Sequence, residues 1–286
     1  MNDWPARPYI ADNTLHVCDW LDLMQALPDA SVDMILTDMP YGTTACAWDT
    51  VIDLTAWWVE CRRVMKPRGA VVCTASGLFE VDLIISNREW FKYKWIWVNK
   101  SRPTFFIHAK NRPLKVTEEV LVFSSGAINH ETVSDNRMSY YPQFTEGEPY
   151  KRDASFSKFG SVVGKRPSHK YMIRVNDGTR YPVDVIEINE SNNGVKHPTQ
   201  KPVALFEYLI KTYTQPGELV VDPFVGSGTT AVAARITGRR FICGDQSEEY
   251  IDIAHKRVFP TFGQPPKRKR EEKPITDLPL FAGLAS

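Results

Sequence analysis

Short apolar runs, typical of buried strands, alternate along this chain with longer segments in which apolar residues recur at helical spacing. Before residue 126 this pattern predicts strands at 14–19, 31–38, 70–75, 92–98 and 118–124, and helices at 20–27, 53–65 and 78–87. After residue 195 it predicts helices at 203–214, 228–238 and 248–259, and strands at 219–222 and 239–245. Proline and glycine in KPRG (66–69) and QPGE (215–218) predict turns.

Strands that alternate with helices predict an α/β fold, in which a doubly wound, mostly parallel sheet is covered on both faces. Between residues 126 and 195 the pattern gives way to Ser, Asn, Gly, Tyr and charge, with short apolar pieces such as DVIEI (184–188). We interpret this region as an insertion that carries specificity, because recognition tends to lie on loops held by a rigid scaffold. The predicted parts are therefore 1–125, 126–195 and 196–262, followed by a Pro-rich, charged and disordered tail at 263–286.

Composition narrows the class of protein. Of 286 residues, 43% are apolar and 24% are charged, which is ordinary for a globular protein. No apolar run could span a bilayer, and no signal peptide is evident. The five cysteines are scattered, odd in number and never arranged as C-x-x-C, which argues against a disulfide framework or a metal site. A reducing compartment, the cytoplasm, is the expected location.

A local excess of positive charge is hidden by the formal net charge of +1. Residues 87–115 contain eight basic residues against the single acid Glu89, and aromatic residues are interleaved throughout. This composition is typical of a surface that contacts phosphates and stacks on bases. The alternative for the strand at 92–98 is that its aromatic residues are core and its lysines are merely solvated.

A glycine-rich turn follows the strand predicted at 219–222. The segment LVVDPFVGSGTTAVAA (219–234) places Asp222 at the strand end and glycines before a helix, where the backbone can bend sharply and approach a ligand. Seventeen residues after Gly228 the next strand ends at Asp245, where a carboxylate could bind a ribose diol. The spacing is not G-x-G-x-x-G and no Walker lysine is present, so NAD and ATP are disfavoured.

Three motifs resemble those of the DNA amino-methyltransferases. DPFVGSGTT (222–230) resembles their S-adenosylmethionine (SAM) motif, TDMPYG (37–42) their catalytic (D/N/S)-P-P-(Y/F) motif, and HPTQKP (197–202) the segment just upstream of the SAM motif. The order matches the permuted β group of these enzymes. The resemblance implies a Rossmann-like SAM-dependent methyltransferase fold, SAM as cofactor and double-stranded DNA as substrate.

The resemblance also implies which residues hold SAM. On its methionine and ribose side we expect Asp222, Phe224, Gly226 and Gly228, with Ser227 and Thr229 at the helix start. Asp245 would take the ribose hydroxyls, with Gln246 as a further cofactor residue, and Asp19 would lie near the adenine ring, with Asp22 as its rival. At its methionine end we expect Asp38, His197, Thr199 and Lys201. Lys201 would pair with the cofactor's carboxylate. The alternative is that HPTQKP is only a rigid entry to the next helix.

The catalytic motif suits methylation of an exocyclic amine, which is a poor nucleophile because its lone pair is delocalised into the base. By the resemblance, the Asp38 carboxylate and the Met39 backbone carbonyl would accept the two amine N–H groups, and Tyr41 would stack on the base. Pro40 holds Met39 in an extended conformation. The base must be flipped out of the duplex. Met39 replaces the usual first Pro, so a catalytically silent SAM- or DNA-binding relative is the alternative.

Asp at position 38 resembles the adenine-N6 members of the family, whereas Ser is commoner among the cytosine-N4 enzymes. Adenine N6 is therefore the predicted target, and cytosine N4 and RNA substrates are the alternatives. Phosphate contacts are expected from basic residues on both sides of the insertion boundary: Lys100, Arg102, Lys110, Arg112, Lys115, Arg137, Lys165 and Arg166. An insertion with no DNA role is the alternative for the last three.

The family resemblance and the C-terminal tail at 263–286 suggest further partners. A restriction-modification context and a homodimer both occur in the family, and a DNA substrate would place the protein at the nucleoid. DLPLF (277–281, Asp277 to Phe281) resembles the short Q-L-(S/D)-L-F peptides that dock bacterial sliding clamps, with Asp in place of the first Gln.

Overall fold

One mixed sheet forms the centre of the protein. The computed structural model describes residues 11–42, 52–128, 136–153, 173–189 and 200–260. The strands of the sheet are β1 (Thr14–Val17), β2 (Val32–Thr37), β3 (Met65–Ala75), β4 (Phe91–Val98), β5 (Thr117–Phe123), β10 (Val185–Glu187), β11 (Leu219–Asp222) and β12 (Arg240–Asp245). Their spatial order is β1-β12-β11-β2-β3-β5-β4-β10. Only β5 runs antiparallel to its neighbours, β3 and β4, so the expected mostly parallel sheet is confirmed.

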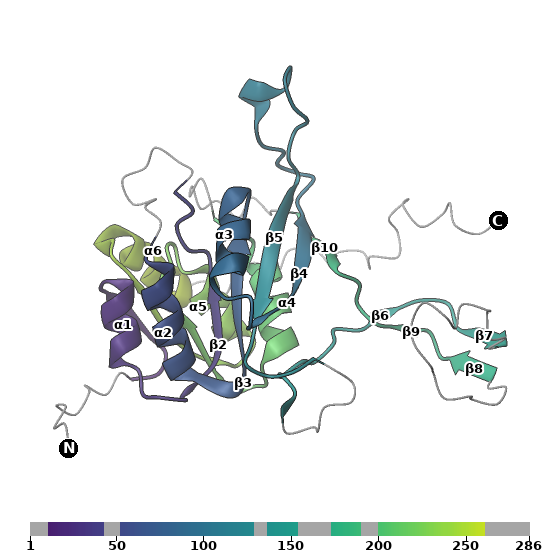
Figure 1. Cartoon of the computed structure of the whole chain (residues 1–286), viewed down its shortest axis with the longest axis horizontal. Coiled ribbons are helices and arrows are strands. Elements are labelled where there is room, and N and C mark those ends of the chain that lie inside the picture. The colour runs from purple at the N-terminus through teal and green to yellow at the C-terminus, as the bar shows by residue number, and fades with distance from the viewer. Residues whose placement is uncertain (1–10, 43–51, 129–135, 154–172, 190–199, 261–286) are drawn as a thin grey trace. The chain divides into compact units, whose positions relative to one another are not determined.

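Helices cover both faces of this sheet (Figure 1). One face carries α1 (Trp20–Ala26), α2 (Leu54–Val64) and α3 (Leu78–Ser86), and the other carries α4 (Val203–Tyr213), α5 (Thr229–Ile236) and α6 (Glu248–Val258). Two apolar clusters correspond to these faces. Within β2, Ile35 belongs to the first cluster and Met34 to the second, which explains why the whole strand is buried.

Polar residues mark the starts of several helices, as their sequences suggest. The side chains of Asp19, Asp53 and Ser247 accept hydrogen bonds from backbone N–H groups in the first turns of α1, α2 and α6. No helix in these described ranges is long and apolar enough to cross a membrane.

The prediction of a turn at KPRG is wrong. Residues 66–69 lie within β3, where the register against β2 shifts: Met65 pairs with Val32, and Ala70 pairs with Met34. The extra residues are therefore accommodated as an irregularity inside one strand rather than as a turn before it. Gly69 is required there, because a Cβ atom would lie 2.7 Å from the Asp33 carbonyl oxygen.

The described residues form two compact units. One contains those up to Tyr141 and from Val183 onward, and it includes the whole sheet. The other lies within Pro142–Pro182, where β6 (Thr145–Glu146) pairs with β9 (Thr179–Arg180) and β7 (Tyr150–Asp153) with β8 (Ile173–Asn176). This second unit lies inside the range 126–195 expected for the insertion, whereas β10, from the same range, is an edge strand of the sheet. The predicted functional division of the chain into 1–125, 126–195 and 196–262 stays a prediction.

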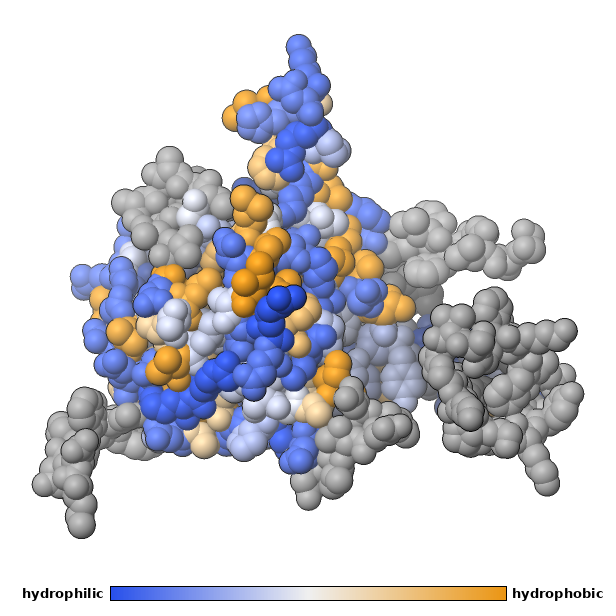
Figure 2. Space-filling model, viewed as in Figure 1, coloured by the Kyte–Doolittle hydropathy of each residue, from blue (hydrophilic) through white to orange (hydrophobic). Residues whose placement is uncertain are grey.

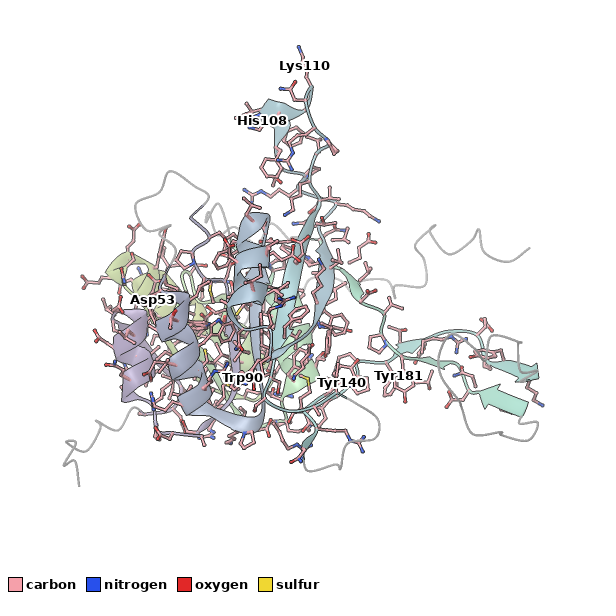
Figure 3. The ribbon with its side chains drawn as sticks, in the orientation of Figure 1. Asp53, Trp90, His108, Lys110, Tyr140 and Tyr181 are labelled. Carbon is pink, nitrogen blue, oxygen red and sulfur yellow. The ribbon has the colours of Figure 1, made fainter. Side chains whose placement is uncertain are left out.

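A long connection joins β4 to β5. Residues 99–116, which we call the arm, extend away from the sheet and carry the short helix η1 (Phe106–His108) near their far end (Figure 1). Apolar surface is exposed around this end, next to hydrophilic surface along the arm (Figure 2). Side chains drawn as sticks place His108 and Lys110 there (Figure 3).

Candidate active site

The predicted catalytic motif begins where β2 ends. Asp38 follows Thr37 at the carboxyl end of the strand, which is the edge where ligands bind in parallel α/β sheets. The Tyr41 hydroxyl donates to Asp38 Oδ1 at 2.6 Å and lies 2.8 Å from the Thr74 hydroxyl of β3. Thr74 also donates to the same Asp38 oxygen. Two hydroxyl groups therefore converge on Oδ1.

The other oxygen of Asp38 has a lysine partner. Lys201 Nζ lies 2.9 Å from Asp38 Oδ2 and 3.0 Å from Glu118 Oε1, which comes from β5. Glu118 Oε1 is also 3.1 Å from the Tyr41 hydroxyl. These five residues, which we call the Asp38 cluster, bring together segments that are up to 163 positions apart in the chain. Lys201 thus contacts the catalytic motif, and its pairing with the cofactor's carboxylate stays a prediction.

Burial and charge shift the pKa values within the Asp38 cluster. Burial alone would lower the pKa of Lys201, but the carboxylates of Asp38 and Glu118 outweigh it and raise that pKa above the ordinary lysine value. Burial raises the pKa of Glu118; Lys201 opposes this shift and Asp38 adds to it. Burial, followed by the charges of Asp38 and Glu118, raises the pKa of Tyr41. Lys201 therefore remains a cation, and Tyr41 remains a neutral donor.

The residues on either side of the motif's proline are fixed by packing. Met39 is 2% exposed and belongs to the apolar cluster that also contains Trp57 and Ile242. The ring of Tyr41 stacks on Phe79 of α3, with centroids 5.1 Å apart and planes inclined at 22°. Burial therefore anchors Met39 at the position where the family has a stiffer Pro.

The turn between β11 and α5, residues 223–228, is here called the glycine turn. Gly226 and Gly228 have φ angles of 50° and 91°, a left-handed region that favours glycine. A Cβ atom on Gly228 would lie 2.7 Å from Ala254 Cβ in α6, whereas one on Gly226 would meet no atom within 4 Å. Gly228 thus allows two helices to approach closely, and Gly226 borders open space.

The carboxylate of Asp222 connects the glycine turn to β2 through hydrogen bonds. Its carboxylate accepts hydrogen bonds from the Thr37 hydroxyl at 2.7 Å, from the Phe224 backbone N–H at 3.0 Å, and from the Thr230 hydroxyl. It is 2% exposed, and burial raises its pKa to about 7 although all three hydrogen bonds oppose that shift. Because Thr37 precedes Asp38, Asp222 also sets the distance between the glycine turn and the Asp38 cluster.

Three more predicted cofactor residues meet beside the glycine turn. Asp245 Oδ2 accepts from the Gly226 N–H at 3.0 Å, and Gln246 Nε2 donates to Asp19 Oδ2 at 2.5 Å. The meeting follows from strand order, because β1 and β12 are parallel neighbours and Val17 is in register with Asp245. Asp19 also caps α1, so Asp22 is one turn further along that helix.

The remaining residues of the SAM motif connect the glycine turn to its surroundings. Ser227 Oγ lies 3.1 Å from Gln200 Oε1 and accepts from Arg257 Nη1 at 2.9 Å, and the Thr229 hydroxyl donates to the Lys201 carbonyl at 3.3 Å. The Phe224 ring lies 6.3 Å from the Trp20 ring. The segment that carries Lys201 is therefore bonded to the start of α5.

The predicted DNA-contacting residues differ in their surroundings. Lys100 pairs with Glu187 at 2.9 Å, and Lys115 lies 3.8 Å from Glu119, so both are engaged in ion pairs at the base of the arm. Exposed positions further along the arm hold Arg102, Lys110 and Arg112. Arg137 is also exposed. His197, Thr199, Lys165, Arg166 and the segment from Asp277 to Phe281 lie outside the described residues.

Known proteins that are similar to this chain include two type II methyltransferases. Type II methyltransferase M.BglII from Bacillus subtilis is 27% identical over 263 residues, covering 85% of this chain and 68% of the relative. Type II methyltransferase M.HinfI from Haemophilus influenzae is 25% identical over 272 residues, covering 86% and 68%.

Solved structures share the fold. The PvuII DNA methyltransferase, described as cytosine-N4-specific, superposes with a TM-score of 0.60 at 17% identity, covering 89% of both chains. The M1.HpyAVI–SAM complex superposes with a TM-score of 0.54 at 24% identity, covering 85% of this chain and 98% of that one.

The model of the N6/N4 DNA methylase family matches residues 32–256, a range that contains both the catalytic motif and the glycine turn. The chain belongs to this DNA methylase family. In this DNA methylase the sequence motifs located Asp38, Tyr41 and Lys201, but sequence reasoning missed Thr74 and Glu118. A signal for Glu118 existed: two acids, EE, open a strand that is otherwise apolar. Thr74 gave no signal, because a threonine in a buried strand is ordinary.

Proposed function

We propose that this DNA methylase transfers a methyl group from SAM to the exocyclic N6 amine of an adenine flipped out of duplex DNA. One observation carries the proposal: the Asp38 carboxylate stands at the carboxyl end of β2, held by Thr74 and Lys201. It adjoins Thr37, whose hydroxyl bonds to Asp222 beside the glycine turn at 2.7 Å. An amine acceptor and a nucleotide-type turn are thereby neighbours.

The residues around the glycine turn fit SAM as the cofactor. The space at Gly226 is open, since a Cβ there would meet no atom within 4 Å. Asp245 offers a carboxylate suited to ribose hydroxyls, and the Asp19–Gln246 pair offers polar groups for an adenine edge. A structural relative, M1.HpyAVI, is described in complex with SAM. When bound, SAM would supply an electrophilic methyl group.

The Asp38 cluster supports a role in orienting the amine. Lys201 occupies Asp38 Oδ2 at 2.9 Å, so a substrate amine would approach Oδ1, which now accepts from the Thr74 and Tyr41 hydroxyls. The Tyr41 hydroxyl now donates to Oδ1 at 2.6 Å, so an entering amine N–H would replace one donor with another at little net cost. By the resemblance, the Tyr41 ring, which stacks on Phe79 with centroids 5.1 Å apart, would stack on the base. The Met39 carbonyl would accept the second N–H.

Adenine is favoured because Asp opens the motif, as in the adenine-N6 members that the sequence resembles. One observation favours cytosine N4 as the alternative: the PvuII enzyme, with a TM-score of 0.60, is described as cytosine-N4-specific. The Asp38 carboxylate and the Met39 carbonyl would accept from an adenine N6 amine and from a cytosine N4 amine equally well. Which base is methylated therefore depends on the shape of the base pocket. A restriction-modification role is suggested by the two type II methyltransferases among the relatives.

The test incubates unmethylated plasmid DNA with purified protein and SAM and then analyses the nucleosides by mass spectrometry. Asp38→Ala is the active-site variant, and Asp82→Ala, which changes an exposed aspartate of α3, is the matched control. We expect N6-methyladenine with the wild type and the control and at least about a hundredfold less with Asp38→Ala, because aligned contacts at the reacting atom are lost. Calorimetry of SAM binding to both variants checks that the cofactor site survives.

Other products would change the conclusion. N4-methylcytosine would retain the mechanism and replace the target. No methylated base in plasmid, host genomic DNA or RNA, despite SAM binding, would make the protein a silent member of its family.

A further inference from the structure

The arm has an unusual combination of charge and exposure. Between Asn99 and Val116 the sequence contains five Lys or Arg residues and no acidic residue. Nearly every side chain from Ser101 to Leu114 is exposed, including large apolar ones. Phe106 is 64% exposed and Ile107 is 95% exposed, and Figure 2 shows this apolar surface at the end of the arm. Such groups are normally buried unless they meet a partner.

The end of the arm has a defined local structure that directs these two side chains outward. Phe105 adopts a left-handed conformation with φ of 68°, which is uncommon for an aromatic residue. The Arg112 guanidinium covers its ring at 4.1 Å from the centroid. The backbone N–H groups of Ala109 and Arg112 bond back to Phe106 and His108 at 3.2 Å and 3.0 Å. Phe105, at 39% exposure, thus has one ring face against Arg112, whereas Phe106 and Ile107 are exposed to a much greater extent.

The base of the arm is fixed to the active site. Its two sides pair through the Asn99 N–H to the Val116 carbonyl at 2.7 Å and the Thr104 N–H to the Lys115 carbonyl at 2.8 Å. Glu118, two residues beyond Val116, belongs to the Asp38 cluster through Lys201 at 3.0 Å. DNA that presents a base to Asp38 would therefore lie beside the arm.

We propose that the end of the arm is a DNA wedge, in which Phe106 and Ile107 enter the base stack and occupy the gap left by the flipped base. Apolar side chains that enter between bases are a known means of unstacking DNA. The cationic arm complements the phosphates on either side, with Lys110 beside the wedge. The inference rests on the proposed function, because a flipped base creates the gap that the wedge fills.

The test compares the double variant Phe106→Ala plus Ile107→Ala with the wild type. Ile236→Ala, which changes an apolar residue of α5 that is 61% exposed, is the control. One substrate is a duplex containing the site that the wild type methylates in plasmid DNA, and the other has an abasic position opposite the target base. We expect about tenfold or greater loss of methylation on the intact duplex and recovery to within about threefold on the abasic duplex, because little unstacking is then needed.

A second readout does not depend on methyl transfer. Permanganate oxidises unstacked thymines, so plasmid DNA bound by the protein with S-adenosylhomocysteine should show reactive thymines with the wild type and far fewer with the double variant. Wedge-dependent reactivity without any methylation would support the wedge while refuting the proposed function. Methylation without a wedge-dependent difference would refute only the wedge.

Two further results would overturn the proposal. An equal loss on intact and abasic duplexes, together with loss of DNA binding, would mean that the two side chains only strengthen binding. Binding of the wild type but not the double variant to anionic phospholipid vesicles, with unchanged methylation of DNA, would assign this apolar surface to a membrane.

Discussion

Glu118 holds two members of the Asp38 cluster at once. Its Oε1 atom lies 3.0 Å from Lys201 Nζ and 3.1 Å from the Tyr41 hydroxyl, and both of these groups also contact Asp38. A carboxylate in this position orients the lysine toward Asp38. We therefore regard Glu118 as a positioning residue.

Glu118→Gln tests this role, since it keeps the shape and removes the charge. We expect kcat to fall about tenfold or more with little change in the KM for SAM, because a small misplacement at the reacting atoms is costly. Burial raises the pKa of Glu118, so wild-type kcat should fall on acidification at a higher pH than an ordinary Glu would give, and the variant should lack that limb.

Glu80→Gln is the control for this prediction, because Glu80 is a similarly shielded carboxylate that pairs with Lys94 at 2.7 Å outside the Asp38 cluster. An unchanged kcat and pH profile in Glu118→Gln would show that Glu118 has no part in positioning Lys201.

At the scale of elements, the two glycines of the β11–α5 connection meet different structural requirements. Gly228 is where α5 and α6 approach, since its Cβ would lie 2.7 Å from Ala254 Cβ. Gly226 has a similarly left-handed backbone but open space in front of it. The same motif therefore combines a packing requirement with a ligand requirement.

Gly228→Ala and Gly226→Ala should separate these requirements. Gly228→Ala should lower the free energy of unfolding by about 2 kcal/mol or more, because a steric clash adds to the left-handed strain. Gly226→Ala should cost only about 1 kcal/mol of stability but weaken SAM binding about tenfold, because its Cβ enters the proposed cofactor space. Urea unfolding and calorimetry measure the two effects.

Gly238→Ala is the matched control for the glycines, because Gly238 has a φ of 73° and a Cβ there would meet nothing within 4 Å. Gly238→Ala should therefore show only the loss of stability that comes from left-handed backbone strain. If Gly226→Ala bound SAM as tightly as Gly238→Ala does, the open space at Gly226 would not belong to the cofactor.

At the scale of the whole sheet-containing unit, Asp222 connects local chemistry to global stability. It is buried among apolar strands, and burial raises its pKa to about 7 from an ordinary value of 3.8. The unfolded chain releases this proton near pH 4, whereas the folded protein retains it until about pH 7. Unfolding therefore releases a proton in this window, and rising pH destabilises the fold through this group.

Asp222→Asn should remove that dependence. The free energy of unfolding of the wild type, relative to the variant, should decline between about pH 4 and pH 7 by about 4 kcal/mol at most, at about 1.4 kcal/mol per pH unit. Below pH 4 and above pH 7 the difference should be constant. Urea titrations at pH 4, 5.5 and 7.5 measure it, and parallel curves for the two proteins across this range would contradict the raised pKa.

The sequence by itself determined the local features of this protein. Apolar runs and helical spacing depend only on near neighbours, so they predicted the strands and helices on both sides of the insertion. Motif residues with fixed local chemistry, such as Asp38, Asp222 and Gly228, were also found, because their positions in strand ends and turns are encoded by adjacent residues. The turn expected at KPRG failed because pairing with β2 overrode its turn-forming residues.

Only the tertiary structure decided which distant residues meet. Strand order placed β5 antiparallel beside β3 and so delivered Glu118 and Thr74 to Asp38. In the folded sheet, Lys201 also lies between the carboxylates of Asp38 and Glu118, and the short run at 185–187 forms an edge strand beside β4. Such contacts arise from burial of apolar faces across the whole sheet, and no local pattern in the sequence records which strands that burial will pair.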